Sequence, residues 1–360
     1  MFQLNLTDYD RRVYETELRG FLPDNLIDIH THIWKNTFRP QGEPNGGSTW
    51  IDLVADEQTA EDLTGGFRAL FPGQAVTPLV FGGVSHDVGQ CNAYVRESAQ
   101  AYGFPTLFRT TYDMPPDFLE SEVRQGGFLG LKPYLSNCPP YIPEKEIRIF
   151  DFLPHEHLEA ADRNGWIVML HIPRAARLRD ALNIAQLMEI ERKYPNVRLV
   201  VAHIGRAYSK EDIGDAFEVL RNTRHMLFDF TANVCDDAIK ACIRAVGTKR
   251  LLFGSDLPIA IMRMYRVVEG GVYRNVVPRG LYGDVSGDPH MRQTDETDIT
   301  LMIYEELRAL KRCAFDLKLS DGDIEDILYR NARDLLAGAG YKEVVFSGIN
   351  LSSYGRDTTR

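Results

Sequence analysis

The chain has 360 residues, enough for one large α/β domain or for two smaller ones. Its 41 Lys and Arg residues are outnumbered by 51 Asp and Glu residues, and the net charge of -10 argues against a nucleic-acid partner, which needs a basic face. Five scattered cysteines form no CxxC pair, and no apolar run is as long as a membrane span. The N-terminus also lacks the apolar core of a secretory signal, so we expect a soluble cytoplasmic protein without a membrane partner.

Eight short apolar segments follow one another along the chain, and several of them are hydrophobic without interruption. Continuous apolar runs are typical of strands that are buried on both faces of a parallel sheet. The predicted strands cover residues 26–33, 75–83, 104–112, 127–136, 166–173, 197–205, 225–233 and 250–258.

Amphipathic, helix-like segments fill the gaps between these runs. Gly165, Pro195 and Gly247 supply stop signals after three of them. Alternating strands and helices indicate a parallel α/β fold, and eight repeats favour a (β/α)8 TIM barrel, as a single domain over residues 1–360. A doubly wound open sheet is the alternative architecture, but no strand is followed by a GxGxxG turn.

Two segments interrupt the repeat, at about residues 35–73 and 259–300, and both are rich in Gly, Pro and polar residues. In a barrel, both would leave from the C-terminal ends of strands and would stand around the mouth. We expect these insertions to act as substrate lids or as contacts in a homo-oligomer. A C-terminal helical segment is expected at about residues 300–340.

Polar side chains gather at the ends of the predicted strands. His30 and His32 lie two residues apart, and such residues point to the same side of a strand. His171, His203 and Asp256 end the fifth, sixth and eighth strands, and a barrel would bring all of these ends to one mouth. Imidazoles with a carboxylate suit Zn²⁺ or a similar divalent ion, and they leave a coordination position for water.

These segments resemble the amidohydrolase superfamily of metal-dependent barrel enzymes, and specifically its amidohydrolase-2 branch. The matching motifs are IDIHTH for the HxH pair, MLHI and VVAHIG for the fifth- and sixth-strand histidines, and FGSDLP for the eighth-strand aspartate. The resemblance spans residues 26–336. It implies a TIM barrel that acts on a small-molecule substrate, with a metal held by His30, His32, His171 and Asp256.

Lys132, late in the fourth predicted strand, matches a lysine that many members carry in a motif similar to GxKxHP. The chain reads GLKPYLS, so it departs from the pattern at the next two residues, Pro133 and Tyr134. In binuclear members a fourth-strand lysine is carbamylated and bridges two metal ions, which requires the neutral amine. We expect one divalent ion, Zn²⁺, with a second ion only if Lys132 is carbamylated. Lys132 otherwise binds a substrate carboxylate or pairs with Asp256.

Five further residues are predicted to contact the substrate. Arg174 and Arg206 each begin a loop beside a proposed ligand, where a guanidinium can hold a carboxylate through two hydrogen bonds. The competing interpretation of each is an ordinary ion pair with a nearby acid. The other candidates are Arg109 inside the third strand, His86 just past the second strand and Tyr134 at the end of the fourth.

The remaining histidines are not assigned to the site. His155 and His157 lie at the start of a helix, where residues two apart diverge, so both are expected on a solvated face. His225 opens the seventh strand at the end opposite the mouth and is expected to be structural. His290 lies in the second insertion and has no predicted place.

The preferred mechanism is hydrolysis of an amide or lactone in a small, carboxylate-bearing substrate. The metal would lower the pKa of its bound water, Asp256 would carry the proton to the leaving group, and His203 would polarise the scissile carbonyl. Non-oxidative decarboxylation of an aromatic or unsaturated acid is the main rival, because the same branch contains such enzymes. A metal-free Schiff-base lyase that uses Lys132 and a non-catalytic barrel also remain open.

Overall fold

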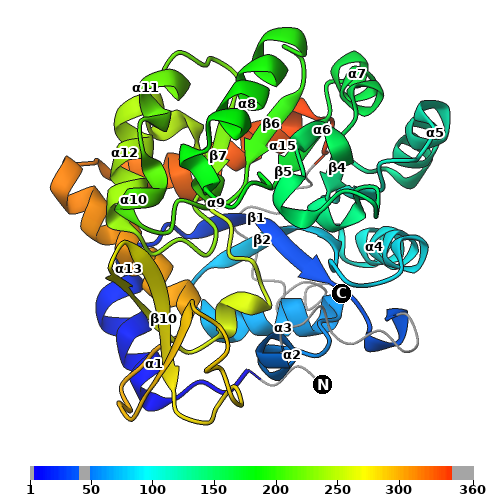
Figure 1. Cartoon of the computed structure of the whole chain (residues 1–360). Coiled ribbons are helices and arrows are strands. Elements are labelled where there is room, and N and C mark those ends of the chain that lie inside the picture. Colours follow the sequence, from blue (N-terminus) through cyan, green and yellow to red (C-terminus); the bar gives the residue numbers. More distant parts are fainter. Residues whose placement is uncertain (1–3, 40–48, 343–360) are drawn as a thin grey trace, which may run out of the picture.

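The computed structural model describes residues 4–39 and 49–342 and has the architecture of a (β/α)8 TIM barrel (Figure 1). Strands alternate with helices along the chain, and the helices lie outside the strands. The barrel strands are β1 (Asn25–Ile33), β2 (Ala75–Gly82), β3 (Phe108–Thr110), β4 (Gly130–Pro133), β5 (Ile167–Leu170), β6 (Arg198–Val201), β7 (Leu227–Asp229) and β8 (Leu251–Leu252).

The barrel strands form two parallel sheets that meet edge to edge. β1 pairs with β2, and β3 to β8 pair with one another in sequence order. Beside β3, the Val80 amide donates to the Pro105 carbonyl at 3.0 Å. Beside β8, the Ile29 amide donates to the Phe253 carbonyl, also at 3.0 Å. These two seams join the sheets into a ring, so the eight apolar runs predict the strand order correctly.

An extra residue in β1 determines which side of the strand His30 faces. The register with β2 shifts between residues 28 and 31, which marks a β-bulge. Before the bulge, Ile27 and Ile29 belong to the apolar cluster inside the barrel. Strict alternation would turn His30 away from that cluster, but its ring lies 5.2 Å from the ring of Phe81, which is a member. The bulge therefore lets His30 follow Ile29 on the inner side of the strand.

The barrel helices begin and end at signals that the sequence carries. Asp87 accepts a hydrogen bond from the Gln90 amide at the start of α4, and α7 ends at Gly165, whose φ of 63° is left-handed. The helices outside the strands are α3 (Ala60–Leu70), α4 (Val88–Tyr102), α5 (Pro116–Gly126), α7 (His155–Asn164), α8 (Ala181–Lys193), α11 (Ala216–Leu220), α12 (Asp236–Val246) and α13 (Met302–Leu317).

Shorter helices occupy the connections and the ends of the described chain. Helix α15 (Asn331–Gly338) closes the end of the barrel away from the histidines, because Leu335 and Leu336 pack into the interior cluster beside Ile27. Every helix among the described residues is too short or too polar to cross a lipid bilayer. The other short helices include α1 (Asp8–Val13), α2 (Thr49–Val54), α6 (Ile149–Phe152), α9 (His203–Arg206), α10 (Lys210–Ile213) and α14 (Asp321–Glu325).

Both insertions contain more regular structure than the sequence pattern predicts. In the first, residues 40–48 lie outside the described residues, and α3 takes the place of the barrel helix after β1. Thr59 and Asp62 form a capping box at its start, a helix-start signal that the sequence itself carries. The second insertion folds into a three-stranded sheet of β9 (Tyr265–Glu269), β10 (Val272–Pro278) and β11 (Met291–Thr294). The Gly270–Gly271 turn, with positive φ at both residues, joins β9 to β10.

Candidate active site

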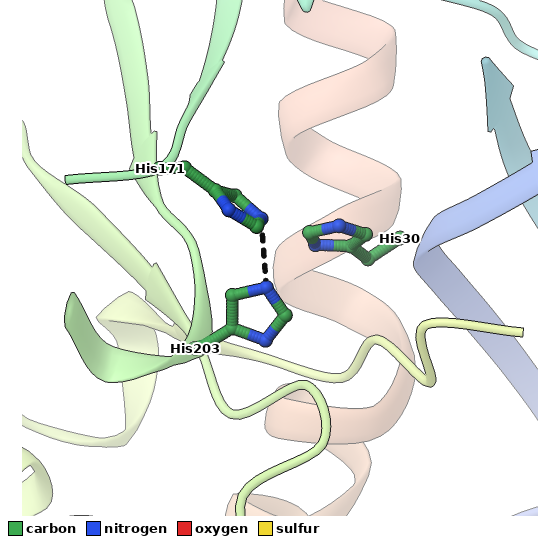
Figure 2. A group of neighbouring side chains, drawn as sticks. All are labelled: His30, His171 and His203. Atoms are coloured by element: carbon green, nitrogen blue, oxygen red, sulfur yellow. Dashed lines mark hydrogen bonds between the residues drawn. The ribbon is translucent and has the colours of Figure 1, made fainter. Parts of the chain in front are cut away.

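Three imidazole rings from different strands converge inside the barrel (Figure 2). His30 lies on β1, His171 follows β5 and His203 follows β6. One ring nitrogen of each lies within 4.8 Å of the others, and the Nε2 atoms of His171 and His203 are 2.7 Å apart. His30 forms a second group of this kind with His32 and Asp256. The structure thus brings together five residues that the sequence places at the ends of four strands.

In His30 and in His203, the Nδ1 atom contacts a neighbouring oxygen, which leaves Nε2 facing the other histidines. His203 Nδ1 lies 2.8 Å from the Thr231 carbonyl oxygen, and His30 Nδ1 lies 3.1 Å from Asp229 Oδ2. A carbonyl and a carboxylate only accept hydrogen bonds, so both Nδ1 atoms carry the proton and donate. Burial lowers the pKa of His30 and of His203, so both rings are neutral and each Nε2 is an unprotonated acceptor.

His32 and Asp256 face each other in a similar way. The Tyr134 hydroxyl donates to the Gly82 carbonyl at 3.0 Å, so it accepts from His32 Nδ1 at 3.1 Å. His32 Nε2 then lies 2.9 Å from Asp256 Oδ1. Burial raises the pKa of Asp256, but its contacts with the histidines outweigh burial and lower it, so this residue is a carboxylate at neutral pH.

The Nε2 atoms of His30 and His203 are therefore buried acceptors, and the Asp256 carboxylate lies beside them. Such a group is costly unless cations or donors lie among its members. Imidazole nitrogens and a carboxylate oxygen are ligands of zinc and similar divalent ions, and ligating histidines usually donate their other N–H to a carboxylate or a carbonyl. The residues present fit a divalent ion in two groups that share His30, one with His171 and His203 and the other with His32 and Asp256.

Lys132 of β4 lies next to this cluster and is fully buried. Its Nζ is 3.3 Å from His30 Nε2. Burial lowers the pKa of Lys132 to about 7, opposed by two nearby carboxylates. Asp256 pairs with His32, so within the described residues the alternative Lys132–Asp256 ion pair is not formed. A buried lysine that loses its proton this readily is able to react with CO₂, as carbamylation requires.

Asp229, at the end of β7, connects two of the histidines and is absent from the residues predicted for the site. It is fully buried, with Oδ2 at His30 Nδ1 and Oδ1 accepting from the His203 backbone amide at 2.6 Å. The one signal in the sequence is an acid within the apolar run LFDF. Isolated acids in buried strands are rare without partners, so this pattern indicates a role for Asp229 even before its partners are known.

The backbone at the cluster is held in uncommon conformations. His203 has a φ of 57° and Asp256 a φ of 65°, both in the left-handed region, and strained residues of this kind concentrate at functional sites. Two residues before Asp256, a Cβ on Gly254 would lie 2.7 Å from His30 Cβ and 2.3 Å from Thr231 Oγ1. Only glycine fits there without displacing a histidine of the cluster.

A cavity of about 360 Å³ opens beside the cluster, and its walls include His32, His171 and Asp256. Two of the predicted substrate contacts, His86 and Tyr134, also line it. Other walls come from the residue after β1, from the first insertion and from the loops after β2 and β8, and the sequence pattern did not assign these residues to the site. They include Trp34, Arg39, Ile51, Asp52, Val84 and Ile259.

None of the three predicted arginines is among the described residues that line this cavity. Arg109 donates to three backbone carbonyl groups within residues 83–86, at 2.6 Å each, so it holds the loop after β2 in place. Arg174 and Arg206 also donate to backbone carbonyl groups, at 2.7 and 3.3 Å. Backbone carbonyl groups in loops and short helices need donors, and these arginines supply them.

The expectation of a solvated face is wrong for His157, which is buried in α7 with Nε2 2.8 Å from the Met114 carbonyl oxygen. Its partner lies in the loop before α5, which local sequence does not reveal. His155 contacts the Tyr194 hydroxyl at 2.7 Å. His290 stacks on Tyr273 in the inserted sheet, with the ring centres 4.2 Å apart.

Solved structures with this architecture support the same fold. An amidohydrolase from Burkholderia multivorans with bound zinc is 14% identical, with a TM-score of 0.58 and coverage of 87% of this chain and 99% of that one. A candidate 2-pyrone-4,6-dicarboxylic acid hydrolase from Acinetobacter baumannii with bound citric acid is also 14% identical, with a TM-score of 0.53 over 87% and 99% of the chains. 2,6-Dihydroxybenzoate decarboxylase in complex with 2,6-dihydroxybenzoate is 12% identical, with a TM-score of 0.55 over 88% and 100%.

At this level of identity, the solved structures establish the fold and leave the reaction open. No curated protein matches the chain. The family model described as amidohydrolase matches residues 27–337, which include every member of the histidine–aspartate cluster. The match covers most of the chain, and the chain therefore belongs to the amidohydrolase family.

Proposed function

We propose that the protein is a metal-dependent hydrolase that opens an amide or lactone bond in a small, carboxylate-bearing substrate. The observation that carries the proposal is the position of Asp256, which belongs both to a candidate metal-binding group with His30 and His32 and to the wall of the cavity. A substrate in the cavity would therefore lie against the one carboxylate among the candidate metal ligands. The family and the structural neighbours, which include enzymes of both hydrolytic and decarboxylating type, support an enzyme.

Each group of residues has a separate role in the proposed hydrolysis. A divalent ion held by His30, His32, His171 and Asp256 supplies Lewis-acid activation of water or of a substrate oxygen when it is bound. Asp256, ionised at neutral pH, accepts the proton of the attacking water and returns it to the leaving group. His203, whose Nδ1 is tied to a backbone carbonyl, holds Nε2 as an acceptor 2.7 Å from His171 Nε2, where it can contribute to binding the ion.

Decarboxylation of an aromatic or unsaturated acid is the second candidate, and the cavity wall favours it. Trp34 and His86 lie with ring centres 5.2 Å apart, and Ile51, Val84 and Ile259 add apolar surface. A planar ring or conjugated acid fits such a wall well. In this reaction the ionised Asp256 would first take up a proton from water or from the substrate, and it would then deliver that proton to the carbon that loses CO₂.

Isotope labels separate the two reactions. We would incubate the zinc-loaded protein with 2-pyrone-4,6-dicarboxylate, a lactone, and with 2,6-dihydroxybenzoate in water labelled with ¹⁸O and deuterium. Hydrolysis places ¹⁸O in the product, whereas decarboxylation releases CO₂ and places deuterium on the product carbon. Label in carbon with CO₂ release, and none in oxygen, would replace the hydrolase proposal by the decarboxylase.

Metal content tests the assignment of one ion. Elemental analysis of the zinc-loaded protein should give close to one ion per chain, and His30→Ala or His171→Ala should remove it. Two ions in the wild type, falling to one in Lys132→Ala, would instead show that Lys132 is carbamylated and bridges a metal pair.

A further inference from the structure

Arg39 is the only Lys or Arg among the described residues that line the cavity. Its side chain is 20% exposed, and it lies in the wall formed by the first insertion. The cavity that exposes Asp256 and His171 thus also exposes a permanent positive charge. A guanidinium of this kind is suited to bind a carboxylate.

The present partners of Arg39 leave part of its guanidinium available. Nη2 lies 2.5 Å from Asp52 Oδ1 and 3.6 Å from Asp56 Oδ1, and Nε donates to His86 Nε2 at 3.4 Å. Nη1 has no hydrogen-bond partner among the described residues. The second oxygen of Asp52 is buried and has no hydrogen-bond partner within the same residues. The Arg39–Asp52 pair therefore uses one contact where a two-bond geometry is available to both groups.

The Arg39–Asp52 pair is thus held by a single hydrogen bond. A carboxylate in the cavity offers Arg39 the two parallel hydrogen bonds that Asp52 does not provide. The wall next to Arg39 is aromatic and apolar, since Trp34 and His86 face the cavity together with Ile51. The indole N–H of Trp34 is taken by the Asp56 carbonyl at 3.0 Å, so Trp34 presents apolar ring surface to a ligand.

We propose that Arg39 forms an anion subsite for a substrate carboxylate remote from the histidine cluster, and that Asp52 is the internal counter-ion that this carboxylate displaces. The substrate class is then an acid with two anionic ends joined by a planar, apolar body, such as an aromatic or conjugated dicarboxylate. One end lies at the histidine–aspartate cluster and the other at Arg39. The inference rests on the proposed function for the reaction, whereas recognition by Arg39 is measurable without turnover.

Calorimetric binding of benzoate, isophthalate and terephthalate to the zinc-loaded protein tests the subsite. We expect the better of the two dicarboxylates to bind the wild type at least about tenfold more tightly than benzoate, the gain expected for charge-assisted hydrogen bonds. Arg39→Gln should abolish this preference and leave benzoate binding within about twofold of wild type. Asp52→Asn should act in the opposite direction and tighten dicarboxylate binding, because the competing carboxylate is gone.

The exposed ion pair of Arg279 with Asp295 supplies matched controls, since Arg279→Gln and Asp295→Asn make the same chemical changes away from the cavity. Neither control should change the preference for a dicarboxylate. The subsite is wrong if the wild type does not prefer a dicarboxylate, or if Arg39→Gln and Asp52→Asn weaken all three acids alike, as loss of a structural ion pair would. If no substrate were turned over, the proposed function would be wrong but the Arg39 subsite would not, because calorimetry measures binding without turnover.

Discussion

Asp256 is both a candidate ligand and the proposed proton carrier, and one substitution separates these roles. Asp256→Asn keeps an oxygen and nearly the same volume at this position, but an amide does not carry protons at neutral pH. We expect the variant to retain its fold and much of its metal, while turnover falls by ~10² to 10⁴, the usual contribution of general acid–base catalysis. Steady-state kinetics should show the loss in kcat and in kcat/KM alike. A near-normal kcat would rule out the proton-carrying role.

A substitution at Asp229 tests whether its contacts with His30 and His203 increase metal affinity. In Asp229→Asn the His203 amide keeps an acceptor, but His30 Nδ1 loses the carboxylate that fixes its proton. Loss of such outer partners commonly reduces metal affinity by about 10- to 100-fold, so we expect zinc affinity to fall in this range. Competition with a zinc-binding dye measures it, with exposed Asp316→Asn as the control. Unchanged affinity in Asp229→Asn would show that the contact is only structural.

Glu306 of α13 is a buried carboxyl whose ionisation opposes folding. Burial and the nearby Asp28 raise the pKa of Glu306 well above its usual value, so the folded protein holds a proton that the unfolded chain releases. The stabilisation from this proton is fully present below the unfolded pKa of ~4.3 and is lost as pH rises through the folded pKa. Glu306→Gln removes this loss, while its side-chain oxygen still accepts from the Ala232 amide.

We therefore expect Glu306→Gln to raise the free energy of unfolding of the metal-free protein at pH 8 by at least about 1.4 kcal/mol, the equivalent of one pKa unit. The gain should be smaller at pH 5. Urea unfolding at both pH values measures it. Equal gains at the two pH values would show that ionisation of Glu306 is not the cause.

At the scale of secondary-structure elements, Gly254 controls how closely the end of β8 approaches β1. In Gly254→Ala the new methyl group would meet His30 and Thr231, so we expect weaker zinc binding and a lower melting temperature. At Gly65 inside α3, an added methyl group would have no neighbour within 4 Å, and Gly65→Ala should stabilise the protein by about 0.5 to 1 kcal/mol. Calorimetric melting and zinc titration of both variants test the contrast. Equal effects would contradict it.

The elements themselves were largely predictable, because burial in a parallel barrel leaves a continuous apolar run at each strand. The ends of those runs also predict which histidines meet. The bulge in β1 was not predictable, since it depends on pairing with β2 and leaves no mark on the spacing of His30 and His32. The inserted sheet of β9 to β11 was also missed, because its partly exposed strands lack long apolar runs.

The contacts that were missed share one cause. Asp229, Arg39 and His157 each act on atoms contributed by another segment, and no local pattern reports such partners. Arg109 illustrates the reverse error, because a buried arginine in a strand does need partners, but these are backbone carbonyl groups. Residue type thus predicts that a charge is satisfied without predicting what satisfies it.

At the scale of the whole molecule, metal binding and stability are linked. The candidate ligands come from strands at both ends of the barrel sequence, so a bound ion favours the folded chain over the unfolded one. An ion present at 1,000 times its dissociation constant stabilises a protein by about 4.1 kcal/mol. We expect chelation to lower the melting temperature and zinc to restore it, as measured by calorimetry. His171→Ala should show the lower value with or without zinc, and a normal zinc response in this variant would contradict the assignment.

The seam between β1 and β8 also determines when the site is completed during synthesis. Asp256 follows its contact His32 by 224 residues, and at about 5 to 20 residues per second a ribosome needs at least about 10 s to add them. Until then His30 and His32 lie on β1, whose edge has not yet paired with β8. Metal delivery to the complete ligand set is therefore possible only after Asp256 has been added, and chains that stop before β8 leave the ribosome with a partial and weakly binding set of ligands.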